Sequence, residues 1–245
     1  MKKFWIVFIV FTFIPLSYEL AFSQDISNSV LFYANFDKNL NAETHSKNGK
    51  PLWKRVKATN AGYLGKGIKV LESGYLCYKN ISFPKNGTLS FRLNVDKETA
   101  TDSKKAFLFM LDFPGKKQFS LFLQKDTLLL LVGEDEVSTK AIIAEQLDFY
   151  PEEWHQVVIA WKIDAALGAV YKGGSGRGEV KIYIDGKIMA LNQEVKLPEG
   201  KASAIYLGSS PKKINNFQGI LDEFKIYNHA LNDKEIRDYF NSGGG

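Results

Sequence analysis

Closely spaced β-type segments, separated by turn signals, constrain the fold of this chain more than any other feature of its sequence. About twelve to fourteen such segments follow one another between Ser29 and Tyr227. Thr88–Val95, for example, alternates apolar and polar residues, and Asp185-Gly186 is a two-residue hairpin turn between two further strands. Helical patterns do not alternate with these strands, so a doubly wound parallel sheet is disfavoured. The pattern predicts an all-β antiparallel sandwich or barrel.

The stretch Gly219–Tyr227, GILDEFKIY, places an acidic pair inside an apolar strand. Strict alternation would point Asp222 and Glu223 to opposite faces, so the two carboxylates are poorly placed to act on one bond. Asn232 follows as a helix cap, with Glu235 three residues later, which is the pattern of a capping box. The sequence therefore predicts a late strand followed by one short C-terminal helix.

The first residues are typical of a secretory signal peptide. Lys2 and Lys3 precede an apolar run from Phe4 to Leu16, and Ala21-Phe22-Ser23 offers small residues for cleavage. We expect a signal peptide over residues 1–23 and a single domain over 24–245, with an uncleaved N-terminal anchor as the alternative. No other run is long and apolar enough to span a bilayer. A secreted, periplasmic or cell-surface location is predicted.

Charge and cysteine content restrict the classes of partner. The formal net charge is +5, with acidic and basic residues interspersed, which indicates a solvated surface and no nucleic-acid partner. The chain has one cysteine, Cys77, so an intramolecular disulfide is excluded. A buried, inert thiol is favoured over pairing with another chain. The oligomeric state is not predicted.

Catalytic patterns are weak in this sequence. Glu134 and Glu136 are the nearest approach to a paired-carboxylate strand, but Gly133 and the local composition favour a solvated acidic turn. The three histidines have no histidine or cysteine partner three or four residues away, and no G-x-S-x-G occurs. A noncatalytic protein is therefore expected.

Aromatic side chains in loops are the candidates for sugar binding. Sugar sites combine aromatic faces with a few polar groups. Trp53 lies beside polar loops and is the best exposed candidate, with Tyr63 and Tyr171 as further loop aromatics. Trp154 and Trp161 lie in a strand pattern and are assigned to the core.

Several segments, taken in order, resemble the concanavalin A-like lectin/glucanase superfamily and, within it, the laminin-G-like domains of bacterial extracellular proteins. The resemblance covers about Val30–Phe240, nearly the whole chain after the signal segment. The matching motifs are Phe36-Asp37, Leu64–Ile68, Gly87–Phe91, Glu153–Val157, Lys181–Lys187, Ile205–Gly208 and Gly219–Tyr227.

This resemblance implies a jelly-roll sandwich of two antiparallel sheets, with the first and last strands near each other. It implies a structural Ca²⁺ with Asp37 and Asp222 among its ligands; the alternative is that Asp222 only anchors backbone amides. The sequence departs from the family in the loop after Asp37 and in a Gly-rich insertion, Asp164–Gly178. Both departures fall in loops, where binding specificity usually resides.

The sequence thus predicts an exported, noncatalytic module that binds a polysaccharide or an extracellular protein. The leading alternative is a structural or assembly component of a cell-envelope complex. A diverged glycan hydrolase or lyase is the third reading.

Overall fold

The described part of the chain contains thirteen β-strands and a helix near its C-terminal end. The computed structural model describes residues 29–44, 49–97, 99, 104–163, 177–212 and 215–243, so the expected signal peptide lies outside it. The elements are β1 (Val30–Ala34), β2 (Leu52–Thr59), β3 (Gly67–Ser82), β4 (Gly87–Val95), β5 (Ala106–Asp112), β6 (Gln118–Gln124), β7 (Thr127–Gly133), β8 (Lys140–Ala144), β9 (Trp154–Ile163), β10 (Arg177–Ile184), β11 (Lys187–Lys196), β12 (Lys201–Leu207), β13 (Gly219–Tyr227) and α4 (Asp233–Asn241).

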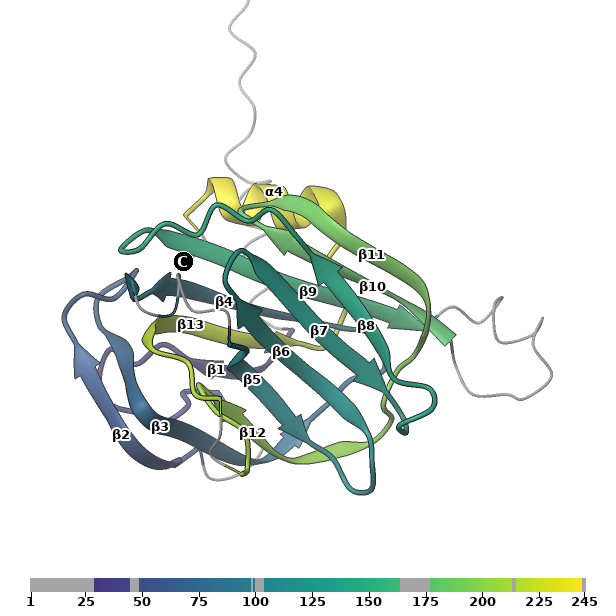
Figure 1. The fold of residues 1–245 in the computed structure, drawn as a ribbon, viewed down its shortest axis with the longest axis horizontal. Helices are drawn as coiled ribbons and strands as arrows, with labels where there is room; N and C mark the ends of the chain where they lie inside the picture. The colour runs from purple at the N-terminus through teal and green to yellow at the C-terminus, as the bar shows by residue number, and fades with distance from the viewer. Residues whose placement is uncertain are drawn as a thin grey trace, which may run out of the picture.

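The strands form two antiparallel layers that share β3. The back layer runs β11-β10-β9-β4-β13, with β1 on β13, and the front layer runs β3-β12-β5-β6-β7-β8, with β2 on β3. Residues 68–70 of β3 pair with β13, and residues 76–82 pair with β12, so this strand passes from one layer to the other. Figure 1 shows β5 to β8 lying over β9, β4 and β13. The predicted antiparallel sandwich, with its first and last strands side by side, is confirmed.

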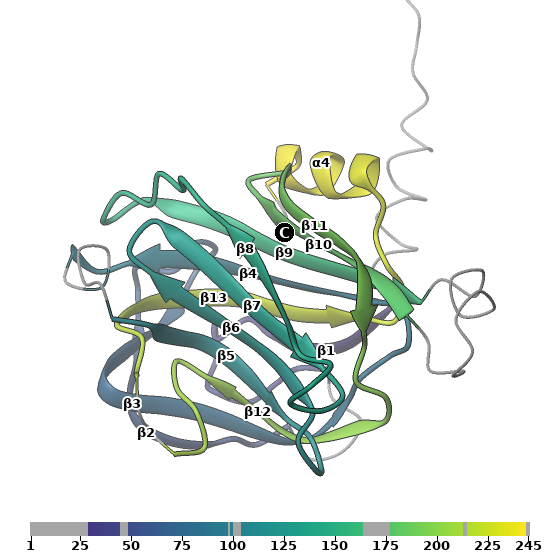
Figure 2. The ribbon, with the colours of Figure 1, turned by 45° about the vertical axis from the view of Figure 1, so that its right-hand side comes forward.

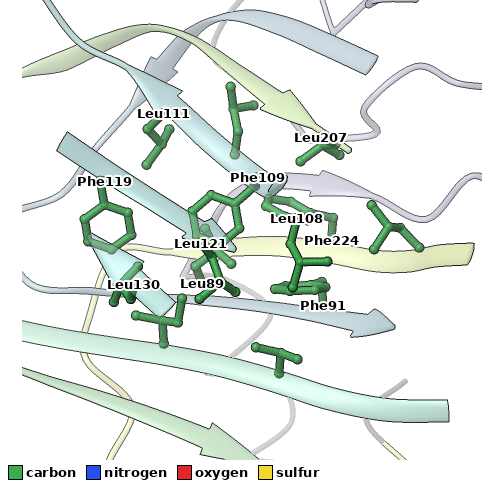
Figure 3. Close-up of a cluster of buried hydrophobic side chains, with 14 of the residues drawn as sticks. Leu89, Phe91, Leu108, Phe109, Leu111, Phe119, Leu121, Leu130, Leu207 and Phe224 are labelled. Carbon is green, nitrogen blue, oxygen red and sulfur yellow. The ribbon is translucent and has the colours of Figure 1, made fainter. Parts of the chain in front are cut away.

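The core lies between the two layers and is rich in aromatic rings. Phe91 of β4 stacks on Phe224 of β13 with ring centroids 5.7 Å apart, and Phe109 of β5 meets Phe224 edge-on at 6.1 Å. Figure 3 shows these rings among leucines from both layers. Trp161 is also buried and stacks on Phe83 at 4.8 Å. The sandwich is therefore filled with side chains and is not hollow.

The outer face of the back layer is covered by α4. The Asn232 side chain accepts the backbone N–H of Glu235, and the Glu235 carboxylate accepts the backbone N–H of Asn232. The predicted capping box is therefore confirmed. Ile236 packs in a second buried cluster with Tyr183 and Tyr227, which point away from the main core. Figure 2 shows the helix lying beside β10 and β11. A capped helix thus closes one outer face of the sandwich.

Three strands, β2, β3 and β13, differ from what the local sequence pattern indicates. Strand β2 was not predicted, because it lacks a β-type pattern. Trp53, Lys54, Arg55 and Lys57 are exposed, which suits an edge strand. Strand β3 is one continuous element of 16 residues, with Gly67 at its start and Gly74 inside it. Strict alternation fails in β13: Glu223 has φ 53° at a bulge, so Leu221 and Phe224 both enter the core.

One region named in the sequence analysis lies outside the described residues. Residues 164–176 of the Gly-rich insertion, including Tyr171, lie outside the described residues. Among the helices of the described part, none has the length and apolar character needed to cross a membrane.

Candidate functional site

Asp222, a predicted metal ligand, lies fully buried on β13 and holds the loop between β2 and β3. Its Oδ2 accepts the backbone N–H groups of Tyr63 at 2.8 Å and Leu64 at 3.2 Å. Its Oδ1 accepts the N–H of Glu223 at 2.8 Å. Burial raises the pKa of Asp222 to about 7, although the amide hydrogen bonds act in the opposite direction. The carboxylate therefore acts as an anchor for backbone amides.

Asp37, the second predicted metal ligand, holds the same loop from the β1 side. Its Oδ1 accepts the N–H of Lys66 at 2.8 Å. Gly65 has φ +65°, and a Cβ there would lie 2.1 Å from Asp37 Oδ1. A glycine is thus required both by the left-handed backbone and by the close approach of the carboxylate. This contact explains why the Leu64–Ile68 motif has a glycine at position 65.

The calcium prediction gains no support from this arrangement. The structure brings Asp37 and Asp222 to the same loop, but N–H donors face both carboxylates, whereas Ca²⁺ needs six to eight converging oxygens. Within the described ranges, no three His, Cys, Asp or Glu side chains are grouped closely enough to share a metal ion. These two carboxylates do not fit a calcium ion by themselves, and calcium binding stays a prediction.

Tyr63 is half-buried by an arginine and a tryptophan. The Arg92 guanidinium lies 3.9 Å from the centroid of the Tyr63 ring, and Trp154 meets that ring edge-on at 5.9 Å. Arg92 is itself buried and donates to the carbonyl of Gly243 at 3.0 Å. Trp154 thus lies on the outer face of the back layer and not in the core. Tyr63 offers only part of its ring to a ligand.

Trp53 is the most exposed tryptophan of the described residues. It lies on edge strand β2 and is 57% exposed. Neither Trp53 nor Tyr63 lines the pocket described next. The structure therefore does not gather the predicted aromatic residues into one site, and their role in sugar binding stays a prediction.

A polar pocket of about 240 Å³ lies where three segments meet at one end of the sandwich. The segments are residues 72–73 of β3, residues 99 and 104–106 between β4 and β5, and residues 215, 216 and 218 before β13. Apart from Ala106, the lining side chains are amides, hydroxyls, ammonium groups and one carboxylate. The pocket can therefore offer many hydrogen bonds to a polar ligand.

Two internal contacts fix the walls of this pocket. Thr99 Oγ1 donates to the Gln218 carbonyl at 2.9 Å, and Asn216 Nδ2 donates to the Gly74 carbonyl at 2.9 Å. Ser73 and Asn215 have φ of 57° and 52°, which non-glycine residues adopt rarely. Strained backbone of this kind often accompanies ligand sites. The segments are thus held in a defined arrangement by long-range contacts.

Sequence reasoning missed this pocket altogether. Its residues are ordinary polar loop residues that come from three regions of the chain. The Asn215-Asn216 pair just before the last strand was the one local sign of it.

The remaining catalytic candidates take structural positions. Glu134 and Glu136 lie in the turn after β7, where Asp135 accepts the Ser138 N–H at 2.7 Å. Glu136 is exposed and pairs with Lys116 at 3.3 Å. His155 Nδ1 lies 2.8 Å from Asp185 Oδ2 in the β10–β11 turn. The acidic turn favoured by the sequence is what the structure contains.

The strand order and the two packed layers define an antiparallel jelly-roll β-sandwich. A family profile described as "Concanavalin A-like lectin/glucanases superfamily", of the laminin-G type, matches residues 72–237, which is more than half of the chain. The chain belongs to this superfamily. No protein of the curated set matches the sequence.

Solved structures with the same fold include binding domains of clostridial toxins. The botulinum neurotoxin serotype D binding domain has a TM-score of 0.69 and 15% identity, with 89% of this chain and 53% of that chain covered. The serotype D ligand binding domain in complex with N-acetylneuraminic acid has a TM-score of 0.65 and 16% identity, covering 90% and 52%. The Paraclostridial Mosquitocidal Protein 1 binding domain has a TM-score of 0.65 and 17% identity, covering 89% and 53%. The chain spans about half the length of these structures, and the identities show a shared fold alone.

Proposed function

We propose that this chain is a noncatalytic binding module for carbohydrate, exported to the cell surface, the periplasm or the medium. The observation that carries the proposal is the pocket between β3, the β4–β5 connection and the segment before β13. Sugars present many hydroxyls, and amide, hydroxyl and charged side chains are the groups that orient them. A pocket of about 240 Å³ has room for one sugar unit.

The described lining of the pocket holds one carboxylate and not a pair, which supports a binding role. Glycoside hydrolysis ordinarily needs two carboxyl groups on either side of the bond. Among the described lining residues, Glu72 is the one carboxylate. Measurable turnover of a glycan that is lost on altering Glu134 or Glu136 would favour the hydrolase reading instead.

The comparisons add support of a general kind. Structures with this fold are described as receptor-binding or ligand-binding domains, and one is in complex with N-acetylneuraminic acid. Because the chain spans half of those structures, the site of that sugar is not transferred to this chain. The export part of the proposal rests on residues 1–23 alone.

Binding to an array of glycans, followed by calorimetric titration of the best ligand, tests the proposal. Gln218→Ala removes a side chain from the pocket, and we expect it to weaken binding about tenfold or more. Gln193→Ala, on β11 and outside the pocket, is the matched control and should bind as the parent chain does. If no glycan binds, or if both variants behave alike, the pocket is not a sugar site.

A protein-contact role has one specific observation in its favour. Leu128, Leu130 and Val132 of β7 enter the core, so Leu129 and Leu131 face outward from the front layer, beside Ile143 of β8, which is 48% exposed. An apolar sheet face of this kind suits a cell-envelope partner. A partner protein that co-purifies with the parent chain but not with Ile143→Lys, with no glycan bound, would favour this second function.

A further inference from the structure

The polar pocket carries more positive than negative charge on its lining. Of the residues that the structure describes, Lys104 and Lys105 line it together with one carboxylate, that of Glu72, and Lys104 already has a contact of its own. Asp96, which precedes these lysines on the same connection, is paired with Lys69 at 3.2 Å. Among the described residues of this connection, Asp96 is the one carboxylate, and it is paired with a lysine of β3.

Several lining groups remain available to a ligand. Thr99 and Asn216 use their side chains to hold the walls, as described above. Ser73, Lys105 and the Asn215 side chain have no hydrogen-bond or ion-pair partner among the described residues. An ammonium group, an amide and a hydroxyl together supply more donors than acceptors. Such a set favours a ligand that presents acceptor oxygens with negative charge.

We propose that the ligand of this pocket is an anionic saccharide, with a carboxylate or sulfate group bound by Lys105 and ring hydroxyls bound by Ser73, Asn215 and Gln218. The inference rests on the proposed carbohydrate-binding function and specifies the chemical class of the sugar. The charge must sit on the unit that enters the pocket, because the pocket has room for about one unit. A charged unit at a chain end or branch meets this requirement.

A matched pair of ligands isolates the charge. Oligogalacturonate and its methyl ester share one skeleton but differ in charge, and a sulfated galactose oligosaccharide separates sulfate from carboxylate. By titration calorimetry we expect the full chain to bind the acid about tenfold or more tightly than the ester. Raising the salt concentration should reduce this difference, since exposed charges are screened.

Three variants assign the effect to the pocket. Lys105→Gln should remove most of the preference for the acid, and Glu72→Gln should strengthen binding of the acid by removing the opposing carboxylate. Lys187→Gln, at the exposed first residue of β11, is the control and should leave the preference unchanged. Melting curves of all variants establish that each remains folded.

The outcomes separate this inference from the proposed function. Equal binding of acid and ester, or an unchanged preference in Lys105→Gln, overturns the anionic-ligand inference while a sugar site lost in Gln218→Ala still supports the function. Absence of binding by acid, ester, sulfated and neutral sugars alike overturns both. A preference for the sulfated sugar over the carboxylate identifies sulfate as the recognised group.

Discussion

The carboxylate of Asp222 accepts the backbone N–H of Tyr63 at 2.8 Å, which joins two residues 159 positions apart in the chain. This contact ties the β2–β3 loop to the last strand. Because Asp37 holds Lys66 of the same loop, two carboxylates from opposite ends of the chain fix one short connection. The loop conformation is therefore fixed by long-range hydrogen bonds together with the glycine at position 65.

Removal of the Asp222 carboxylate should destabilise the protein strongly. Asp222→Ala leaves three backbone N–H groups without their acceptor, and each unsatisfied buried donor costs about 1–3 kcal/mol. We expect the free energy of unfolding to fall by about 3 kcal/mol or more, measured by urea denaturation. Asp148→Ala, at an exposed position, is the control and should change it by less than about 0.5 kcal/mol. Equal effects of the two substitutions would show that the anchor contributes little.

The raised pKa of Asp222 gives stability a specific dependence on pH. With a folded pKa of about 7 and an unfolded value of 3.8, the folded protein binds more protons than the unfolded chain between those limits. The contribution of Asp222 to stability is therefore fully present below about pH 4 and is lost as pH rises through about 7. Its slope is at most about 1.4 kcal/mol per pH unit.

Comparison with Asp222→Asn isolates this contribution. Asp233 and Glu179 have lowered pKa values, Asp233 mainly through its hydrogen bonds to Tyr183 and Lys181, and therefore act in the opposite direction. The difference in unfolding free energy between the parent chain and the Asn variant should fall as pH rises from 4 to 7. A difference that stays constant over this range would refute the assignment.

The architecture was predictable because its physical signals are local. Alternation in Thr88–Val95, the Asp185-Gly186 turn and the Asn232–Glu235 capping box each depend on residues a few positions apart. The pocket was not predictable, because Ser73, Lys105 and Asn215 become neighbours only through strand pairing over long sequence distances. Nothing in a polar loop residue indicates which other loop it will face.

The two metal-ligand candidates show the same limit. The resemblance placed Asp37 and Asp222 close together, and in the structure both carboxylates contact the β2–β3 loop. The direction of their lone pairs, toward amide donors, depends on the conformation of the 62–66 loop and on the bulge at Glu223. Neither is visible in residue identities.

The contact between Gly65 and Asp37 predicts a strong coupling between these two positions. Gly65→Ala should destabilise the protein by about 1–3 kcal/mol, because φ is +65° and the new Cβ would meet Asp37 Oδ1. In Asp37→Ala the steric part of this cost disappears and the backbone part remains. A double-mutant cycle by chemical denaturation should therefore show non-additivity of about 1 kcal/mol. Additive effects would mean that the loop moves away from the carboxylate at little cost.

Thermal melting with calcium and with chelator decides between the two roles of the carboxylates. A ligand that binds only the folded protein and is held at 100 times its Kd adds about 2.7 kcal/mol to stability, so a calcium site would raise the melting temperature by several degrees. Because amide N–H groups face both Asp37 and Asp222, we expect the melting temperature to be the same in calcium and in chelator. Magnesium at the same concentration controls for ionic strength. A rise that is specific to calcium and lost in Asp37→Asn would establish a calcium site and make the amide contacts a feature of the calcium-free protein.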